Sequence, residues 1–245
     1  MKLLINNEYR KLLPDKLEKD INISQGIIKK NEYNKIKEGI IKTHKGSKLL
    51  IKKPDFKDLF MNIKRGPQII TLKDAGIIAS SLGIMKDFMV LDCGGGSGAL
   101  TCFFANITGS KGKIISIEKK PEFCKIIKKN AELFGFKNVQ IINKDLDDYS
   151  PRKKFDAMNL DLPNPQDYAS KANEMLKNGA RITIYVPNTT QLTIAKKAFD
   201  SKNFKLERVF EILLREWDVN ELVCHPKFSM LGHTGFIMCY RKIEV

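Results

Sequence analysis

Three acidic residues each accompany a short apolar stretch that predicts a buried strand. Asp92 lies in 88–93, Glu118 closes 113–118, and Asp145 follows 139–143. In an open parallel sheet, ligands bind outside the carboxyl ends of the strands, so these carboxylates are expected to meet there. Asp92 would accept hydrogen bonds from an amino group, Glu118 from ribose hydroxyls, and Asp145 from the amino group of adenine. Each acid alone would equally fit a turn or surface position, but three at successive strand ends predict a nucleoside site.

A glycine-rich segment at 90–101 follows the first of these strands and opens a predicted helix. Glycines let the backbone turn sharply and approach a ligand closely. Such a turn alone does not distinguish NAD from S-adenosylmethionine (SAM). Asp92 favours SAM, because a carboxylate suits a cationic amino-acid group whereas a diphosphate favours an open helix N-terminus. The predicted SAM contacts here are Asp92, Gly94, Gly96, Ser97, Gly98, Ala99, Leu100, Thr101, Glu118, Lys119, Asp145, Leu146 and Asp161.

Asp161 is the predicted catalytic residue, since it closes the fourth strand at 155–161, opposite the glycine-rich segment. Adenine N1 has a free lone pair, and positive charge spreads to the 6-amino group as a methyl bond forms. A carboxylate that accepts a hydrogen bond from that amino group would stabilise the charge. Methyltransferases that act on exocyclic amines commonly have Asn/Asp-Pro-Pro-aromatic at this point. Leu162 follows Asp161 here, which argues against an exocyclic amine without identifying N1. A turn-capping role for Asp161 stays open.

Strands and helices alternate from about residue 74 onward, which predicts a parallel sheet covered by helices on both faces. The expected fold is therefore α/β, doubly wound and Rossmann-like, as in class I SAM-dependent methyltransferases. Its strands are predicted at 88–93, 113–118, 139–143, 155–161, 179–186, 205–214 and 235–242, and its helices at 99–108, 121–134 and 189–203.

The first part of the chain has a different sequence pattern, in which short apolar stretches are broken by lysine-rich turns. We expect a small β-rich domain over 1–60, with strands at 21–23, 26–28, 39–41 and 47–51, and a methyltransferase domain over 61–245. The lysines make the first domain a candidate RNA-contacting module, and a packing or oligomerisation role is the alternative.

The charge balance of the whole chain predicts a polyanionic partner. The 245 residues carry 43 lysines and arginines against 28 acidic residues, a net charge of +15. An excess of this size attracts nucleic acid, although a thermophile surface is the alternative. The five cysteines and three histidines lack metal-ligand spacing, so reduced thiols and no metal site are expected. No apolar run is long enough for a membrane span, and we expect a soluble, cytoplasmic protein.

From about residue 60 to the end, the chain resembles the tRNA adenine-N1 methyltransferases of the T-loop position-58 class, especially archaeal members. The resemblance implies methylation of tRNA at adenine 58, and possibly at 57, by a homotetramer. It also implies that Gln68 touches SAM. The similar motifs are 65–70 (RGPQII) with Lys73 and Asp74, the glycine-rich segment, Glu118, Asp145, 161–163 (DLP), 215–217 (REW) and 230–236 (MLGHTGF).

The chain departs from this family mildly. Asp92 and Gly95 stand where the family often has Glu and Thr, and Thr71 stands where many relatives have a tyrosine that could stack on the base. Tyr185 is a candidate replacement for that tyrosine, and Arg215 and His233 are candidate RNA or target contacts. Core or turn roles are the alternatives for all three.

Two other functions stay open on the sequence alone. A SAM-dependent methyltransferase for a small molecule, such as a corrin precursor, would share the glycine-rich segment but not need a charge of +15. A non-catalytic RNA-binding subunit would be expected to lack the acids. The presence of Asp92, Glu118, Asp145 and Asp161 favours an active enzyme.

Overall fold

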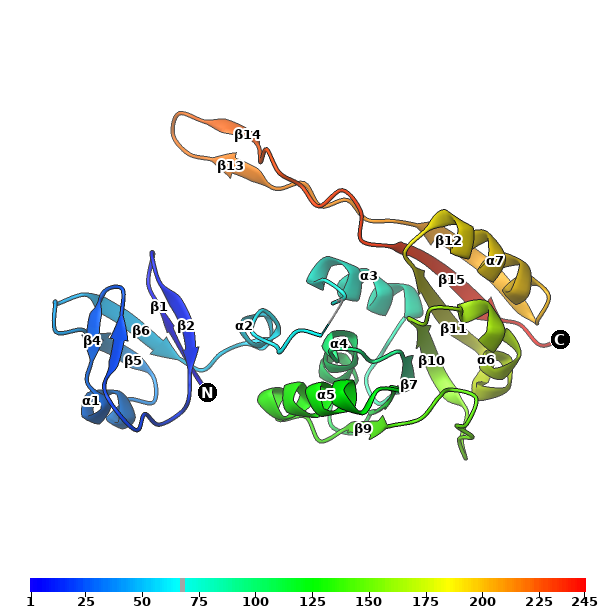
Figure 1. Ribbon diagram of the computed structural model, residues 1–245, viewed down its shortest axis with the longest axis horizontal. Helices are drawn as coiled ribbons and strands as arrows, with labels where there is room; N and C mark the ends of the chain where they lie inside the picture. Colours follow the sequence, from blue (N-terminus) through cyan, green and yellow to red (C-terminus); the bar gives the residue numbers. More distant parts are fainter. Residues whose placement is uncertain (67–68) are drawn as a thin grey trace. The chain divides into compact units, whose positions relative to one another are not determined.

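A computed structural model describes residues 1–66 and 69–245 (Figure 1). The chain divides into two compact units, Met1–Ile63 and Lys64–Val245. The sequence-based boundary at 60/61 lies three residues before this division. Gln68 lies outside the described residues.

The first unit is built on a four-stranded antiparallel sheet in the order β2-β1-β6-β5. A separate hairpin pairs β3 with β4, and α1 and α2 complete the unit. Two of these strands and both helices were not predicted, because β1, β2, α1 and α2 are too short to show a clear period. The bounds are β1 Lys2–Ile5, β2 Arg10–Leu13, β3 Ile21–Ile23, β4 Gly26–Ile28, α1 Lys30–Lys35, β5 Gly39–Lys42, β6 Lys48–Lys52 and α2 Phe56–Phe60.

The second unit contains a seven-stranded sheet in the order β12-β15-β11-β10-β7-β8-β9. The five strands from β11 to β9 are parallel, and β15 and β12 add antiparallel to the β11 edge. The predicted doubly wound α/β fold is confirmed. The strands are β7 Met89–Cys93, β8 Lys113–Ile117, β9 Val139–Ile142, β10 Phe155–Leu160, β11 Leu176–Val186, β12 Phe204–Phe210 and β15 Phe236–Lys242.

The helices of this unit form two groups, which cover the sheet (Figure 1). The helix α4 packs against both α3 and α5, and η1 packs against both α6 and α7. The helix α5 matches its predicted range because Pro121 starts it and Gly135, left-handed at φ 74°, ends it. The bounds are α3 Leu72–Leu82, α4 Ala99–Thr108, α5 Pro121–Phe134, η1 Pro165–Tyr168, α6 Ala169–Met175 and α7 Thr189–Asp200.

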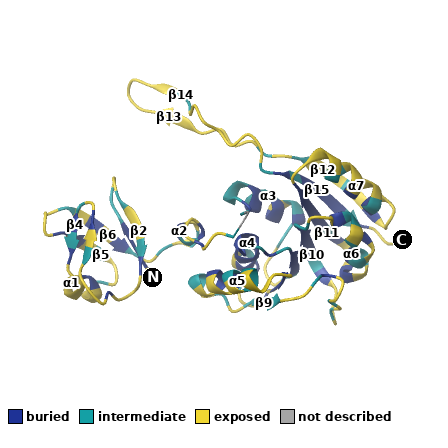
Figure 2. Cartoon of the chain, viewed as in Figure 1, coloured by how far each residue is buried: buried dark blue, intermediate teal, exposed yellow. Residues whose placement is uncertain are grey.

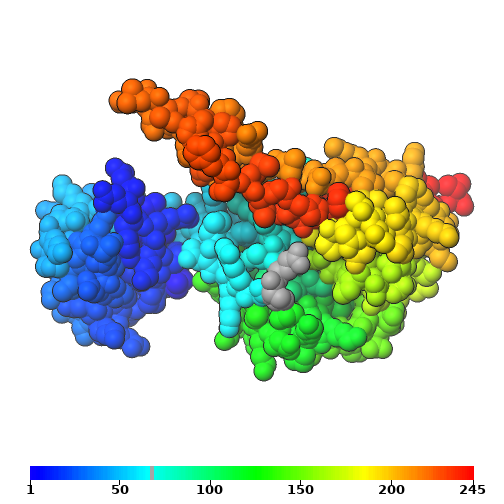
Figure 3. Space-filling view, turned by 45° about the horizontal axis from the view of Figure 1, so that its top comes forward, coloured from blue at the N-terminus to red at the C-terminus, as the bar shows by residue number. Residues whose placement is uncertain are grey.

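The strand predicted at 205–214 ends at Phe210, so its last four residues were assigned wrongly. From there the chain makes an excursion, 211–235, that we call the arm. The arm carries a short hairpin of β13 Trp217–Val219 and β14 Cys224–Pro226. Its residues are mostly exposed, whereas the central strands of the sheet are buried (Figure 2). In the space-filling view the arm is the orange segment (Figure 3). No helix among the described residues is long and apolar enough to cross a membrane.

Candidate functional site

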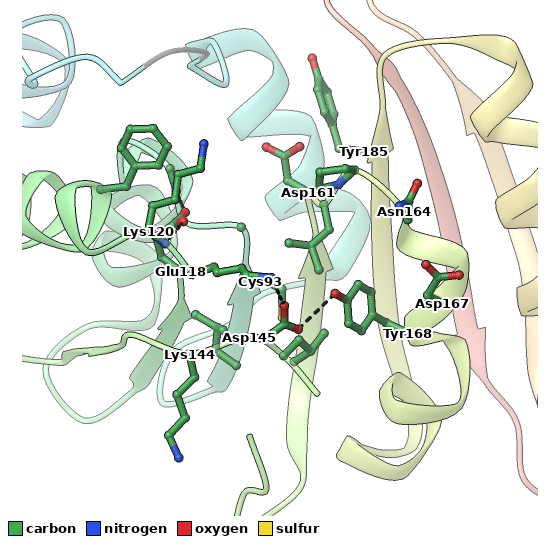
Figure 4. A pocket seen from close by; sticks show the side chains of 18 of the residues that line it. Cys93, Glu118, Lys120, Lys144, Asp145, Asp161, Asn164, Asp167, Tyr168 and Tyr185 are labelled. Atoms are coloured by element: carbon green, nitrogen blue, oxygen red, sulfur yellow. Dashed lines mark hydrogen bonds and ion pairs between the residues drawn. The ribbon is translucent and has the colours of Figure 1, made fainter. Parts of the chain in front are cut away.

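A cavity of about 650 Å³ opens at the carboxyl ends of the parallel strands (Figure 4). Asp161 and Tyr185 lie close together on one part of its wall, and Asp145 faces Tyr168 on another. Seven of the residues that the sequence assigned to SAM line this cavity: Gly94, Gly96, Glu118, Lys119, Asp145, Leu146 and Asp161.

The glycine-rich segment and the end of β10 are held together by the backbone. The Asp161 amide donates a hydrogen bond to the Cys93 carbonyl over 2.9 Å. Gly94 has a φ of 84°, and a Cβ at that position would overlap the backbone carbonyl of Asp161. Only glycine lets these two segments approach so closely, which places Asp161 directly beside the loop.

Asp92 lies in a small recess next to the main cavity. This recess of about 20 Å³ is lined by Asp92, Asp161 and five more predicted residues, together with Ile70 and Gly95. The five are Gly94, Gly96, Ser97, Ala99 and Leu100. The side chain of Asp92 is 1% exposed and accepts hydrogen bonds from Thr101 Oγ1 at 2.6 Å and Asn159 Nδ2 at 3.2 Å. Burial raises its pKa to about 6, against the lowering effect of these donors.

Glu118 supports the glycine-rich segment directly. Its Oε2 accepts a hydrogen bond from the Gly96 amide and its Oε1 from the Lys120 amide, both at 2.9 Å. These contacts fix a carboxylate on the cavity wall at the end of β8. A carboxylate held in this way is suited to accept two hydroxyl groups of a ribose.

Asp145 sits on the other side of the cavity, between two side chains. Lys119 Nζ lies 3.0 Å from its Oδ2, and the Tyr168 hydroxyl donates to its Oδ1 over 3.2 Å. The hydrogen bond from Lys119 is the main reason that the pKa of Asp145 is lowered. Leu146 is 2% exposed and gives this part of the wall an apolar surface.

Asp161 carries the most unusual electrostatics of the cavity. Burial raises its pKa to about 7, and the negative charges of Asp92 and Glu118 add to the effect. None of the ion pairs in the described chain includes Asp92, Glu118 or Asp161. The three carboxylates therefore form a concentration of negative charge that favours a cationic ligand.

Tyr185 is held in the cavity wall by the root of the arm. Its side chain is 5% exposed, and a Cβ on Gly235 would overlap its ring. Next to Gly235, His233 faces Glu211 Oε2 at 2.8 Å and the Pro187 carbonyl at 2.9 Å. Both partners are acceptors, so this geometry suits an imidazolium, and the hydrogen bond to Glu211 raises the pKa of His233. Arg215 is an exposed residue of the arm.

Two predicted SAM contacts do not line either space. Gly98 packs against α5, where a Cβ would lie 3.1 Å from Ile127 Cα, and Thr101 is fully buried beneath Asp92. Several cavity residues were not predicted because single lysines, aromatic residues and amides carry no spacing signal: Lys120, Phe123, Lys144, Asn164, Asp167, Tyr168, Pro187 and Gln191. Within 1–66 and 69–245 no cluster of His, Cys, Asp and Glu could hold a metal, and the five cysteines are free.

These features fit SAM. The cavity has the size of a small-molecule site. Its acids suit a ligand that carries an ammonium group and a sulfonium, and Leu146 offers an apolar surface for a flat ring. The strand-end position is the one expected for nucleoside ligands in open α/β sheets.

The fold and this site define a class I SAM-dependent methyltransferase. The family model described as "tRNA methyltransferase complex GCD14 subunit" matches residues 49–233, and the chain belongs to this family.

Three known proteins illustrate the relationship. The tRNA (adenine(58)-N(1))-methyltransferase TrmI of Thermus thermophilus is 32% identical over 83% of this chain and 81% of its own length. The tRNA (adenine(57)-N(1)/adenine(58)-N(1))-methyltransferase TrmI of Methanocaldococcus jannaschii is 30% identical over 98% and 94%. A crystal structure from Thermotoga maritima, described as a SAM-dependent O-methyltransferase, is 32% identical, covers 100% of this chain and 93% of that one, and has a TM-score of 0.89.

Proposed function

We propose that this protein transfers a methyl group from SAM to N1 of adenine in the T-loop of tRNA, at position 58. The observation that carries the proposal is the position of Asp161. Contacts with Gly94 and Cys93 hold Asp161 beside the recess, and Tyr185 lies next to it. The name of the Methanocaldococcus relative gives positions 57 and 58, and the name of the Thermus relative gives position 58. Mapping the methylated bases decides between one target and two.

Asp161 acts as the acceptor for the 6-amino group of the target adenine. SAM, when bound, supplies an electrophilic methyl group on a positively charged sulfur. The adenine N1 needs no base, because its lone pair is free. Asp161 instead orients the purine edge and stabilises the positive charge that spreads onto the amino group. Tyr185, beside Asp161, offers a flat surface on which the base stacks.

An oxygen acceptor is the second candidate, and the pKa of Asp161 is the observation that favours it. A hydroxyl group has to lose a proton to be methylated, and a carboxylate with a pKa of about 7 is basic enough to take one. The large positive charge of the chain favours tRNA over a small alcohol. Mass spectrometry of digested product distinguishes 1-methyladenosine from a methyl ether.

The first test is Asp161→Asn, with Asp161→Ala beside it. Asparagine keeps the shape and one acceptor but loses the charge, so we expect kcat to fall by about 100-fold or more while SAM still binds. Single-turnover methylation of tRNA transcript measures the rate, and calorimetry measures SAM binding. A folded Asp161→Asn protein with the full methylation rate contradicts the proposal.

We infer the cofactor contacts from the same geometry. Asp92 attracts the ammonium group of SAM, Glu118 binds the ribose hydroxyls and Asp145 the adenine amino group, with Leu146 against the ring. Lys119 orients Asp145. Gln68 is retained as a contact by resemblance alone. The glycine-rich segment supplies the remaining contacts, Gly94, Gly96, Ser97, Ala99 and Leu100, while Gly98 and Thr101 act from behind the wall by packing against α5 and by donating to Asp92.

The first unit serves as an RNA-binding module. Residues 1–63 carry 15 lysines and arginines against 8 acidic residues, so about half of the net charge lies in a quarter of the chain. On β5 and β6, Lys42 and Lys48 are register partners and both are exposed. A base in the T-loop has to be extruded, and phosphate contacts away from the cavity offset that cost.

The arm serves as the contact to a second copy of this chain in a homo-oligomer, a tetramer by resemblance. It exposes large apolar side chains that a monomer would leave in water, and such surfaces mark interaction sites. The most exposed are Leu222 at 95%, Phe228 at 97%, Val219 at 70% and Leu231 at 61%. A tRNA substrate also points to the cytoplasm as the place of action.

A further inference from the structure

A row of four buried polar side chains crosses the sheet next to the cavity. Thr183 on β11 lies beside its register partner Asn159 on β10. Asn159 in turn pairs with Asp92 on β7, and Asp92 pairs with Ser116 on β8. All four are at most 1% exposed. Polar groups buried in a sheet cost free energy unless they are paired, so a continuous row of them calls for a physical explanation.

The hydrogen bonds of this row run in one direction, toward Asp92. Thr183 Oγ1 donates to Asn159 Oδ1 over 2.9 Å, and Asn159 Nδ2 donates to Asp92 Oδ1 over 3.2 Å. Because an ionised carboxylate can only accept, the NH₂ end of the Asn159 carboxamide faces Asp92, and its carbonyl end is left to accept from the Thr183 hydroxyl. Thr101 donates to the other oxygen, Asp92 Oδ2, over 2.6 Å, and shares a 3.0 Å contact with Ser116.

These donors work against a surrounding that favours the neutral form of Asp92. Burial and the charge of Glu118 raise the pKa of Asp92 to about 6, while the donors lower it. The charge of Asp92 also raises the pKa values of Asp161, Cys93 and Cys102, and no cation of the described residues contributes to the pKa of Asp92. At neutral pH the charge of Asp92 therefore depends on hydrogen bonds from Thr101 and Asn159.

We propose that Asn159, oriented by Thr183, is a positioning residue that keeps Asp92 ionised and fixed at the recess where the cationic end of SAM binds. Asn159 does not line either space, so it acts only through Asp92. Each oxygen of Asp92 already accepts one hydrogen bond from the protein, and the charge of Asp92 acts on a cation in the recess without needing a direct hydrogen bond. Such a charge acts more strongly on SAM, which has two positive groups, than on S-adenosylhomocysteine, which has one.

The test is Asn159→Leu, an apolar side chain of similar size, with SAM affinity measured by calorimetry between pH 5.5 and 8.5. A carboxylate attracts the cation above its pKa, so wild-type affinity falls as the pH drops through that value. Removing the Asn159 donor raises the pKa of Asp92 further, so the fall begins at higher pH. For a rise of about one pKa unit from about 6, we expect SAM affinity to drop by about twofold at pH 7 and by nearly tenfold at pH 5.5, and to recover at pH 8.5. S-adenosylhomocysteine affinity is expected to drop less.

Thr183→Val gives an independent arm of the experiment with little change in shape. It is expected to raise the pH midpoint of SAM binding, the pH at which half of the pH-dependent change in affinity has occurred, by a smaller amount. The double variant is expected to match Asn159→Leu alone, because Thr183 acts through Asn159. Thr108→Val is the matched control, since Thr108 is equally buried but donates to the Phe104 carbonyl within α4, away from Asp92. It is expected to leave the midpoint unchanged.

Two outcomes overturn the proposal. One is a folded Asn159→Leu protein whose pH midpoint for SAM equals that of the wild type. The other is an equal loss of SAM and S-adenosylhomocysteine affinity at every pH, which marks a purely structural role. If Asn159→Leu does not fold, an unchanged midpoint in Thr183→Val overturns it. Because the readout is cofactor binding, the result is independent of the tRNA target.

Discussion

Burial is the main reason that the pKa values of the two aspartates beside the glycine-rich segment are raised, and neighbouring negative charges add to it. The pKa of Asp92 is raised to about 6 with a contribution from Glu118, and the pKa of Asp161 to about 7 with contributions from Asp92 and Glu118. In the free protein, protonation relieves this repulsion. A bound cation relieves it as well, so cofactor binding and proton binding compete at this site.

This competition predicts how SAM stabilises the protein at different pH. Both folded pKa values lie above the ordinary value of 3.8, so the protonated acids stabilise the fold at low pH, and this contribution is lost as the pH rises through about 6 to 7. Above that range the acids are ionised, and the positive charge of bound SAM stabilises them instead of the proton. We expect the rise in Tm caused by saturating SAM to be small at pH 5.5 and several degrees larger at pH 8.

Differential scanning fluorimetry across this pH series measures the effect. Asp161→Asn is the control, because it removes the group with the higher pKa and should flatten the upper part of the dependence. A rise in Tm that is the same at pH 5.5 and pH 8 would contradict the charge competition.

The elements of the second unit were largely predictable, because their signals are local. The helices at 99–108 and 121–134 match their predicted ranges, since glycines or a proline bound them. The arm was not predictable. Its hairpin strands have three residues each, too few to show a periodic pattern of apolar residues. Their apolar residues do not pack into a core, so nothing requires buried and exposed positions to alternate.

The candidate site was predictable to a similar degree. The acids at the strand ends were found because the sheet topology brings the ends of successive strands together. The hydrogen-bond partners of Asp92 were not predicted from the sequence. Asn159 and Thr183 become neighbours of Asp92 only through the register of three strands far apart in the sequence, and a buried Asn looks in sequence like any strand residue.

The arm leads to a prediction about assembly. Leu222 and Phe228 are almost fully exposed, and water contact with such large apolar groups is removed when they dock on another chain. We expect Leu222→Ser with Phe228→Ser to lower the mass measured by light scattering after gel filtration by at least one subunit. The paired substitution Lys202→Ser with Lys205→Ser, at exposed polar positions outside the arm, should leave the mass unchanged. A wild-type monomer would contradict the role of the arm.

The distribution of charge over the whole chain bears on how tRNA is recognised. The acids that favour a cation line the cavity of the second unit, while the first unit carries almost half of the net positive charge on a quarter of the residues. The cavity wall carries Lys119, Lys120 and Lys144 as well as the carboxylates of Glu118, Asp145, Asp161 and Asp167, so it has no excess of positive charge with which to bind phosphates. The energy of tRNA binding is therefore expected to come largely from surfaces outside it. The basic first unit is the natural source.

The double substitution Lys42→Gln with Lys48→Gln tests whether the first unit supplies the phosphate contacts to tRNA. Each lost phosphate contact reduces the slope of log affinity against log salt by about one, so a tRNA binding slope reduced by about one to two and a higher KM are expected. The SAM affinity and the single-turnover rate at saturating tRNA should stay the same, because neither lysine lines the SAM cavity. The control Lys111→Gln with Lys113→Gln removes the same charge from exposed positions of the second unit, and should change the slope less. Equal slopes for the wild type and the Lys42→Gln, Lys48→Gln protein would assign tRNA binding to another surface.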